Sequence, residues 1–92
     1  MDLTSVYQKI NNNEYKTKMP FIPRRESPEA FAMYKKEEAR LEQEFKNDAI
    51  EAVGLKGHPK AEKAYALAWD HGHSAGFSDV LGYLSEFADL IL

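Results

Sequence analysis

The stretch from His58 to Leu92 decides the fold, and it reads HPKAEKAYALAWDHGHSAGFSDVLGYLSEFADLIL. It contains no Lys or Arg after Lys63, and apolar residues recur at helical spacing through most of its length. Pro59 can open a helix, because the first helical position tolerates proline. The stretch therefore predicts one long helix over 59–92. Residues 80–92 are apolar around most of that helix, which indicates burial on two sides and hence a homo-oligomer.

A second long helix is predicted upstream of this stretch. Ser27-Pro28-Glu29 combines a capping hydroxyl, a proline at the first helical position and an acid in the first turn. The helix is expected to run to about Val53, where Gly54 can end it in the left-handed conformation. Short connections favour antiparallel neighbours, so residues 27–92 are expected to form a long antiparallel helical hairpin.

The first 26 residues are predicted to hold a short helix and an arm. Apolar residues at i, i+3, i+4 and i+7 mark an amphipathic helix within residues 1–14, with Asp2 as its cap. Residues 15–26 contain Pro20 and Pro23 and should be extended. No strand-like alternation of useful length occurs. The 92 residues therefore predict a single all-α domain.

Charge and composition narrow the class of function. The net charge of −3 argues against general binding to DNA. The sequence contains no run of 18 apolar residues, so it predicts no membrane span. The chain has no cysteine, which excludes disulfides and thiolate metal sites. The arm is locally basic, however, and no acid lies between Tyr15 and Arg25. A positive segment on a mildly acidic protein indicates a small anionic ligand.

The arm and the start of the long helix supply the candidate ligand-binding residues. Arginine pairs with phosphate through two hydrogen bonds, lysine adds a point charge, and aromatic rings offer a face to a base. Together these groups suit a small nucleotide, although an ordinary solvated arm explains the same composition equally well. The candidates are Tyr15, Lys18, Phe21, Arg24, Arg25, Tyr34 and Lys35.

The segment from Trp69 to Gly76 is a second candidate region, for a further pocket or for an interface. Trp69 and His73 share one helical face, and Ser74 is adjacent. Gly72 and Gly76 are four apart, so they are expected to let another backbone approach the helix closely. The alternatives for such a contact are a helix crossing, including one at a subunit interface, and a ligand that lies against the helix.

The same segment does not predict an enzyme. His71 and His73 point about 200° apart on a regular helix and cannot chelate one metal ion together. Residues 72–76 spell Gly-x-Ser-x-Gly, but a nucleophile elbow needs a strand before it, and the preceding residues are helical. We expect no catalytic residues, no metal and no cofactor.

Several of these residues resemble a known family. The stretch from His58-Pro59-Lys60-Ala61 through Trp69 and Gly72-His73-Ser74-Ala75-Gly76 to Val80 is similar to the helical hairpin of the phage anti-CBASS sponges. A related hairpin occurs in anti-Thoeris sponges. The upstream pattern Lys16-Thr17-Lys18-Met19-Pro20-Phe21 resembles the same family, so the resemblance covers about residues 15–92.

The resemblance implies a function and an assembly. The protein would be a homohexamer in the host bacterial cytoplasm that binds cyclic dinucleotides such as 3′,3′-cGAMP without hydrolysis, which prevents activation of the CBASS effector. The family's dinucleotide site pairs an aromatic residue, matched here by Tyr15 or Phe21, with a basic residue, matched by Lys35. Some members hold cyclic trinucleotides in a second pocket, which would correspond to the region of His73 and Ser74. The absence of Arg after residue 63 argues against that second activity.

A rival interpretation assigns the protein to a different functional class. The apolar residues 80–92 could bind a host enzyme directly, which would make the chain a protein–protein inhibitor. A purely structural helical subunit is a third alternative. A nucleotide released from the purified protein on heating would favour the first interpretation over both.

Overall fold

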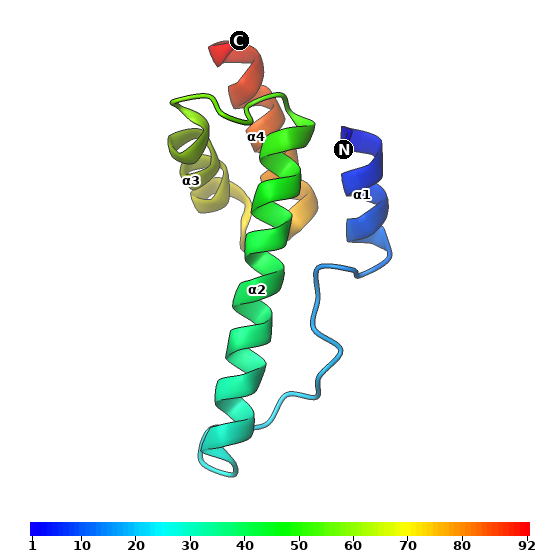
Figure 1. The fold of residues 1–92 in the computed structure, drawn as a ribbon, viewed down its shortest axis with the longest axis vertical. Coiled ribbons are helices and arrows are strands. Elements are labelled where there is room, and N and C mark those ends of the chain that lie inside the picture. Colours follow the sequence, from blue (N-terminus) through cyan, green and yellow to red (C-terminus); the bar gives the residue numbers. More distant parts are fainter.

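The computed structural model describes residues 1–92 and contains four helices and no strand. The helices are α1 (Leu3–Asn11), α2 (Pro28–Ala52), α3 (Ala61–Gly72) and α4 (Phe77–Ile91), as Figure 1 shows. The predicted all-α class is therefore confirmed. None of the helices is both long enough and apolar enough to cross a membrane.

The helix ends follow the capping signals in the sequence. The Asp2 carboxylate accepts a hydrogen bond from the Ser5 N–H at 2.8 Å and so caps α1. The Ser27 hydroxyl accepts one from the Ala30 N–H at 3.4 Å, directly before Pro28. Gly54 follows α2 with φ of +82°, a conformation that favours glycine. The predicted start and end of the upstream helix are therefore confirmed.

The prediction of one continuous helix over 59–92 is wrong, because the chain turns at residues 73–76. Gly76 has φ of +121°, outside the range of helices, and its N–H donates to the Gly72 carbonyl at 3.1 Å. After this turn α4 runs back along α3 (Figure 1). The predicted hairpin of two long helices is replaced by a shorter hairpin of α3 and α4, which packs on α2.

The expected roles of Gly72 and Gly76 must be corrected too. A Cβ on Gly72 would lie 2.8 Å from the Val80 backbone nitrogen and 2.9 Å from the Asp79 carbonyl carbon. Gly72 therefore does allow a close backbone approach, but the approaching helix is α4 of the same chain. Gly76 lies in the turn, with no other group near its missing Cβ, so the two glycines do not form one helical face.

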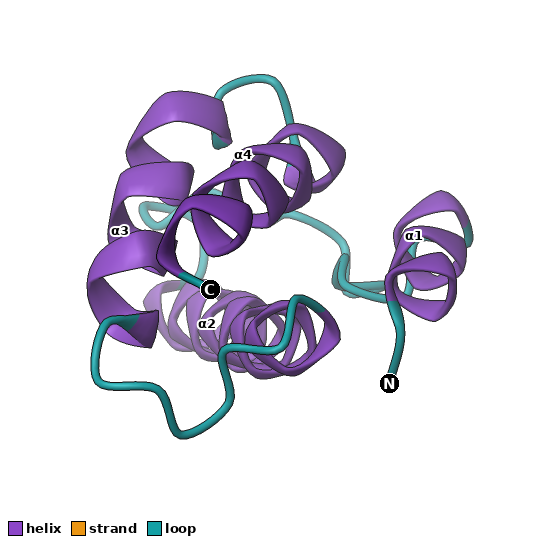
Figure 2. Ribbon diagram, turned by 90° about the horizontal axis from the view of Figure 1, so that it is seen from above, coloured by secondary structure: helices purple, strands orange, loops and turns teal.

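The core lies at the end of the molecule where all four helices meet. Its fully buried large side chains are Val6, Phe45, Leu55, Val80, Leu81 and Leu84. Viewed from above, α2, α3 and α4 form a triangle, and α1 lies to one side (Figure 2). The N-terminal half of α2 extends beyond this core beside the arm only, so the molecule measures 48 × 24 × 23 Å (Figure 1).

Much of the apolar surface of α4 is already buried within the protomer. Val80, Leu81, Leu84 and Ala88 all face the core. The large apolar side chains that remain exposed are Tyr83, which is 38% exposed, Leu90, which is 85% exposed, and Leu92, which is 70% exposed. The apolar circumference predicted from the sequence is thus largely covered by α2 and α3, with a smaller uncovered part at the C-terminal end.

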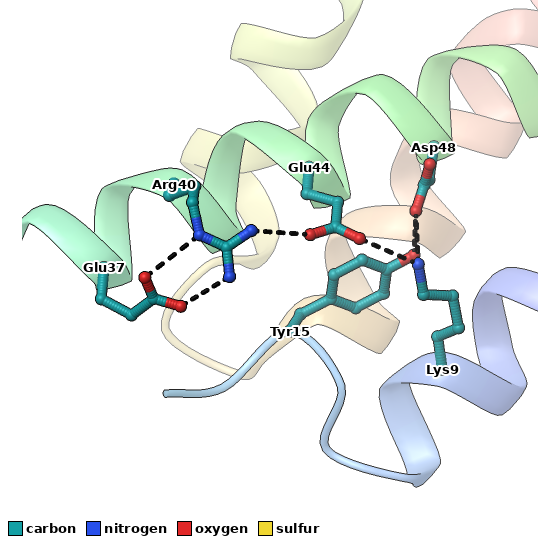
Figure 3. A network of polar contacts seen from close by, with 6 residues as sticks. All are labelled: Lys9, Tyr15, Glu37, Arg40, Glu44 and Asp48. Carbon is teal, nitrogen blue, oxygen red and sulfur yellow. Dashed lines mark hydrogen bonds and ion pairs between the residues drawn. The ribbon is translucent and has the colours of Figure 1, made fainter. Parts of the chain in front are cut away.

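A polar network fastens α1 and the start of the arm to α2 (Figure 3). The Lys9 ammonium donates to Glu44 at 3.2 Å and to Asp48 at 3.1 Å. The Tyr15 hydroxyl donates to the same Asp48 carboxylate at 2.6 Å. Burial raises the pKa of Tyr15, and the bond to Asp48 raises it further. For Lys9, burial alone would lower the pKa, but the hydrogen bonds to Asp48 and Glu44 outweigh it and raise the pKa.

Candidate ligand-binding cleft

The largest hollow of the molecule lies where the arm, α2 and the α3–α4 turn meet. This cleft has a volume of about 640 Å³, within the range of ligand pockets. All three surrounding segments contribute residues to its lining. The arm contributes Tyr15, Lys16 and Thr17, α2 contributes Tyr34, Glu38 and Glu42, and the α3–α4 hairpin contributes Trp69, His73, Gly76, Phe77 and Ser78.

A smaller hollow of about 380 Å³ continues the cleft between α2 and α3. Glu42 and Trp69 line both hollows. Tyr65 and Lys46 lie in the smaller one, where the Lys46 ammonium lies over the Tyr65 ring at 5.6 Å from its centroid. The two hollows form one groove with Trp69 at its middle.

Three aromatic rings form a ladder along α3 beside this groove. Tyr65, Trp69 and His73 are four residues apart, so they share one helical face. Tyr65 and Trp69 have ring centroids 6.2 Å apart and planes at 26°. Trp69 and His73 have centroids 5.4 Å apart and planes at 12°. Such parallel, offset rings are a favourable arrangement, and the ladder ends in the exposed ring of His73.

The backbone fixes the orientation of the His73 imidazole. Its Nδ1 lies 2.8 Å from the Trp69 carbonyl oxygen. A carbonyl oxygen can only accept, so Nδ1 carries the proton in this arrangement. Nε2 has no partner within the chain and remains free for a ligand.

One lysine and one helix N-terminus line the cleft. Lys16 is exposed there and makes no ion pair. The N-terminus of α4 has no side-chain cap, and Val80 is the first residue whose N–H donates within the helix, to Gly76 at 3.2 Å. The N–H groups of Phe77, Ser78 and Asp79 therefore have no backbone acceptor. Helix N-termini of this kind favour anions.

Two carboxylates of α2 also line the cleft. Glu38 is engaged, because it accepts a hydrogen bond from the Lys35 ammonium at 3.2 Å. A hydrogen bond to Glu38 and the charge of this carboxylate raise the pKa of the Tyr34 hydroxyl. Glu42, by contrast, has no hydrogen bond or ion pair in the chain. Burial raises the pKa of Tyr65, and the negative charges of Glu42 and Glu62 add to the effect.

The structure combines the two candidate regions of the sequence into one cleft. Tyr15 and Tyr34 from the first region line the same hollow as Trp69, His73 and Gly76 from the second. The ring of Tyr15 is only 3% exposed and packs edge-on against Phe45 and Phe77, so it closes the cleft floor and has no free face.

The remaining predicted residues lie outside the lining. Phe21 is exposed and meets Tyr34 edge-on, with centroids 5.5 Å apart. Lys35 pairs with Glu38, and Lys18 lines a neighbouring shallow hollow beside Glu37 and Arg40, which shares Lys16 and Thr17 with the cleft. The others are solvent-exposed, Arg24 and Arg25 in the turn before α2 and Ser74 in the turn between α3 and α4.

The groove also contains charged and aromatic residues that were not among the predicted binding residues, among them Lys16, Glu38, Glu42 and Tyr65. Tyr65 could have been found from its spacing of four to Trp69 and of eight to His73. The two glutamates could not, since the sequence does not reveal that α3 crosses α2 beside them. The Gly-x-Ser-x-Gly segment lies between two helices, so it lacks the strand that a nucleophile elbow needs.

Fold and cleft together define a small four-helix protein with an open, aromatic-lined groove. By sequence, the chain belongs to a family of unknown function, DUF8546, whose model matches residues 4–92. Comparisons with curated proteins and with solved structures give no significant match.

Proposed function

We propose that this protein binds a cyclic dinucleotide in the cleft and sequesters it. The observation that carries the proposal is the aromatic ladder of Tyr65, Trp69 and His73 beside a cleft of about 640 Å³ that also holds an uncapped helix N-terminus. Stacking of a base on an aromatic ring stabilises a complex by ~1–3 kcal/mol. The exposed ring of His73 supplies such a face at the end of the ladder.

The phosphates would lie near Lys16 and the N-terminus of α4. Lys16 and the first N–H groups of α4 can each donate to phosphate oxygens. Charge-assisted hydrogen bonds of this kind contribute ~1.5–3 kcal/mol each. Arg24 and Arg25 lie outside the lining, so their contribution would be attraction of the anion over a distance.

Sequestration fits the chemistry of the cleft better than hydrolysis does. The three imidazoles and the carboxylates form no group of three or more that could hold a metal ion. The cleft also contains no serine, histidine and carboxylate in the hydrogen-bonded chain of a catalytic triad. The biological role we propose is that of a phage anti-CBASS sponge in the host cytoplasm, which holds messengers such as 3′,3′-cGAMP away from their effector.

We further propose that the chain works as a homo-oligomer, with a hexamer as the expected state. The support is an uncovered apolar surface between α3 and α4, a shallow hollow of about 270 Å³ lined by Leu67, Phe87, Leu90 and Ile91. Lys60, directly before α3, and Lys63 on α3 flank this surface. Glu86 and Asp89 are exposed on α4, so a second copy could meet it with opposite charges.

The same surface favours the rival function, inhibition of a host enzyme through the C-terminal helix. The two proposals differ in what the purified protein carries and binds. The test is to heat the purified protein, analyse the released small molecules by mass spectrometry, and titrate the empty protein with 3′,3′-cGAMP by calorimetry. A released or titrated cyclic dinucleotide supports the sponge. A protein that binds none, yet captures a host enzyme through Leu90 and Leu92, supports the rival.

A further inference from the structure

The lining of the cleft carries both signs of charge, which restricts the ligand. Lys16 and the α4 N-terminus attract an anion, whereas Glu38 and Glu42 of α2 repel one. A ligand that suits both kinds of group needs an anionic part and a separate edge of hydrogen-bond donors. A nucleotide has this division, because its phosphates are anionic and its base edge is not.

Glu42 is the carboxylate available for such an edge. Glu38 is held by Lys35 at 3.2 Å, but Glu42 has no partner and is half-buried beside Trp69, with which it lines both hollows of the groove. A partly buried carboxylate without a partner loses solvation and gains when donors satisfy it. Its two oxygens can accept two parallel hydrogen bonds.

Among the common bases, guanine has the edge that matches a carboxylate. Its Watson–Crick edge carries two adjacent donors, N1–H and the N2 amino group, which can bind both oxygens of one carboxylate. Adenine and cytosine each offer one amino group beside a ring nitrogen that accepts, N1 in adenine and N3 in cytosine, and this acceptor opposes the second carboxylate oxygen. Uracil offers only N3–H, between two carbonyl acceptors that the carboxylate repels.

From this arrangement we infer that Glu42 is a specificity-determining residue that reads guanine, so that the cleft prefers guanine-containing cyclic dinucleotides over cyclic di-AMP. The inference rests on the proposed nucleotide-binding function. A guanine held at Glu42 would lie beside the ladder, near Trp69, while its phosphates reach toward Lys16.

The experiment compares three cyclic dinucleotides that differ in the base edge. Each guanine of cyclic di-GMP has both donors, N1–H and the N2 amino group. The hypoxanthine of cyclic di-IMP keeps N1–H but lacks the N2 amino group, and the adenine of cyclic di-AMP has neither of the two. Trp69 is the single tryptophan of the chain, so its fluorescence reports binding directly, and calorimetry gives the affinity. We expect cyclic di-GMP to bind most tightly, cyclic di-IMP less tightly and cyclic di-AMP least. The dissociation constants of cyclic di-GMP and cyclic di-AMP should differ by about 10- to 100-fold.

Glu42→Gln tests the assignment without a change in side-chain size. A carboxamide matches adenine with one donor and one acceptor, as glutamine does in DNA recognition, so the preference for guanine should disappear or invert. The matched control is Glu29→Gln, an exposed glutamate in the first turn of α2 outside the cleft, which should leave all three affinities unchanged.

The outcomes separate this inference from the proposed function. Equal affinities of the wild-type protein for the three ligands, or an unchanged preference in Glu42→Gln, would overturn the role of Glu42 while the sponge proposal stands. Failure of the folded wild-type protein to bind any of the three would overturn the proposed function and the inference with it.

Discussion

The imidazole of His73 lies nearly parallel to the indole of Trp69, with ring centroids 5.4 Å apart and planes at 12°. The contact is held by the backbone as well as by stacking, because Nδ1 of His73 lies 2.8 Å from the Trp69 carbonyl oxygen. The ring is therefore oriented before any ligand arrives. An oriented ring loses less conformational entropy on binding than a free one, which favours affinity.

The first prediction concerns this ring. His73→Ala should weaken binding of 3′,3′-cGAMP by ~1–3 kcal/mol through the loss of the stacking face. His73→Phe keeps an aromatic ring but removes Nε2, so it should recover part of the affinity. Calorimetry on the three proteins measures both effects. Equal affinities of His73→Ala and wild type would show that the ladder does not contact the ligand.

The second prediction concerns the crossing of α3 and α4. Gly72→Ala places a Cβ within 3 Å of the backbone of Asp79 and Val80, and neither backbone can move without shifting α4. Such overpacking costs ~1–3 kcal/mol, so the midpoint of thermal unfolding should fall.

Gly82→Ala is the control in the same hairpin. Its new methyl group would meet only the Tyr7 hydroxyl, at 4.0 Å, and alanine favours a helix over glycine. Gly82→Ala should therefore leave stability unchanged or raise it, and a similar loss in both variants would contradict the account.

The third prediction is a loss of stability in alkali. The pKa values of Tyr15 and Lys9 are raised in the folded protein above their ordinary values of 10.0 and 10.5. Above these values the unfolded chain releases protons that the folded chain retains. The free energy of unfolding should therefore fall as the pH rises from about 10.

Tyr15→Phe isolates one part of this effect. The variant keeps the packing against Phe45 and Phe77 but loses the 2.6 Å hydrogen bond to Asp48, so it should be less stable at neutral pH by ~1.5–3 kcal/mol. Its unfolding free energy should also fall less steeply above pH 10, because one proton-linked group is gone. Urea unfolding across pH 7–11 measures both, with Tyr83→Phe on an exposed ring as the control. A slope in alkali identical to that of wild type would contradict the role of the Tyr15 proton.

The fourth prediction tests the proposed assembly. The pair Leu67→Glu and Leu90→Glu places two charges on the uncovered surface between α3 and α4. Both side chains are exposed in the protomer, so the variant should still fold. The oligomer should dissociate, because the two charges would be buried in its interface. Size-exclusion chromatography with light scattering measures the mass, and Gln8→Glu on α1 is the control. A wild-type protein that is monomeric at micromolar concentration would refute the oligomer.

Much of the fold could be predicted because its signals are local. The cap at Asp2, the Ser27-Pro28 start and the stop at Gly54 each depend on a few neighbouring residues, and all three occur as expected. The turn at residues 73–76 was missed because its cause is not local. Apolar spacing continues through it, and the reversal brings α4 against Gly72 and buries Val80, Leu81 and Leu84 in the core.

The candidate site could be predicted only in its two halves. The arm and the Trp69–His73 segment were each indicated by residue type, but their convergence depends on the unpredicted turn, which places the N-terminus of α4 in the cleft. Tyr15 shows the limit of residue type alone. An aromatic ring in a basic arm resembles a stacking platform, yet here Asp48, Phe45 and Phe77 hold it in the core.

The central claim is that the cleft captures a cyclic dinucleotide and returns it unchanged. The most direct measurement incubates 3′,3′-cGAMP with excess protein, separates the protein by gel filtration, denatures it, and identifies the released nucleotide by chromatography. The account predicts that the nucleotide elutes with the protein and is recovered in its cyclic form. Free nucleotide in the small-molecule fraction, or a linear product after denaturation, would contradict it.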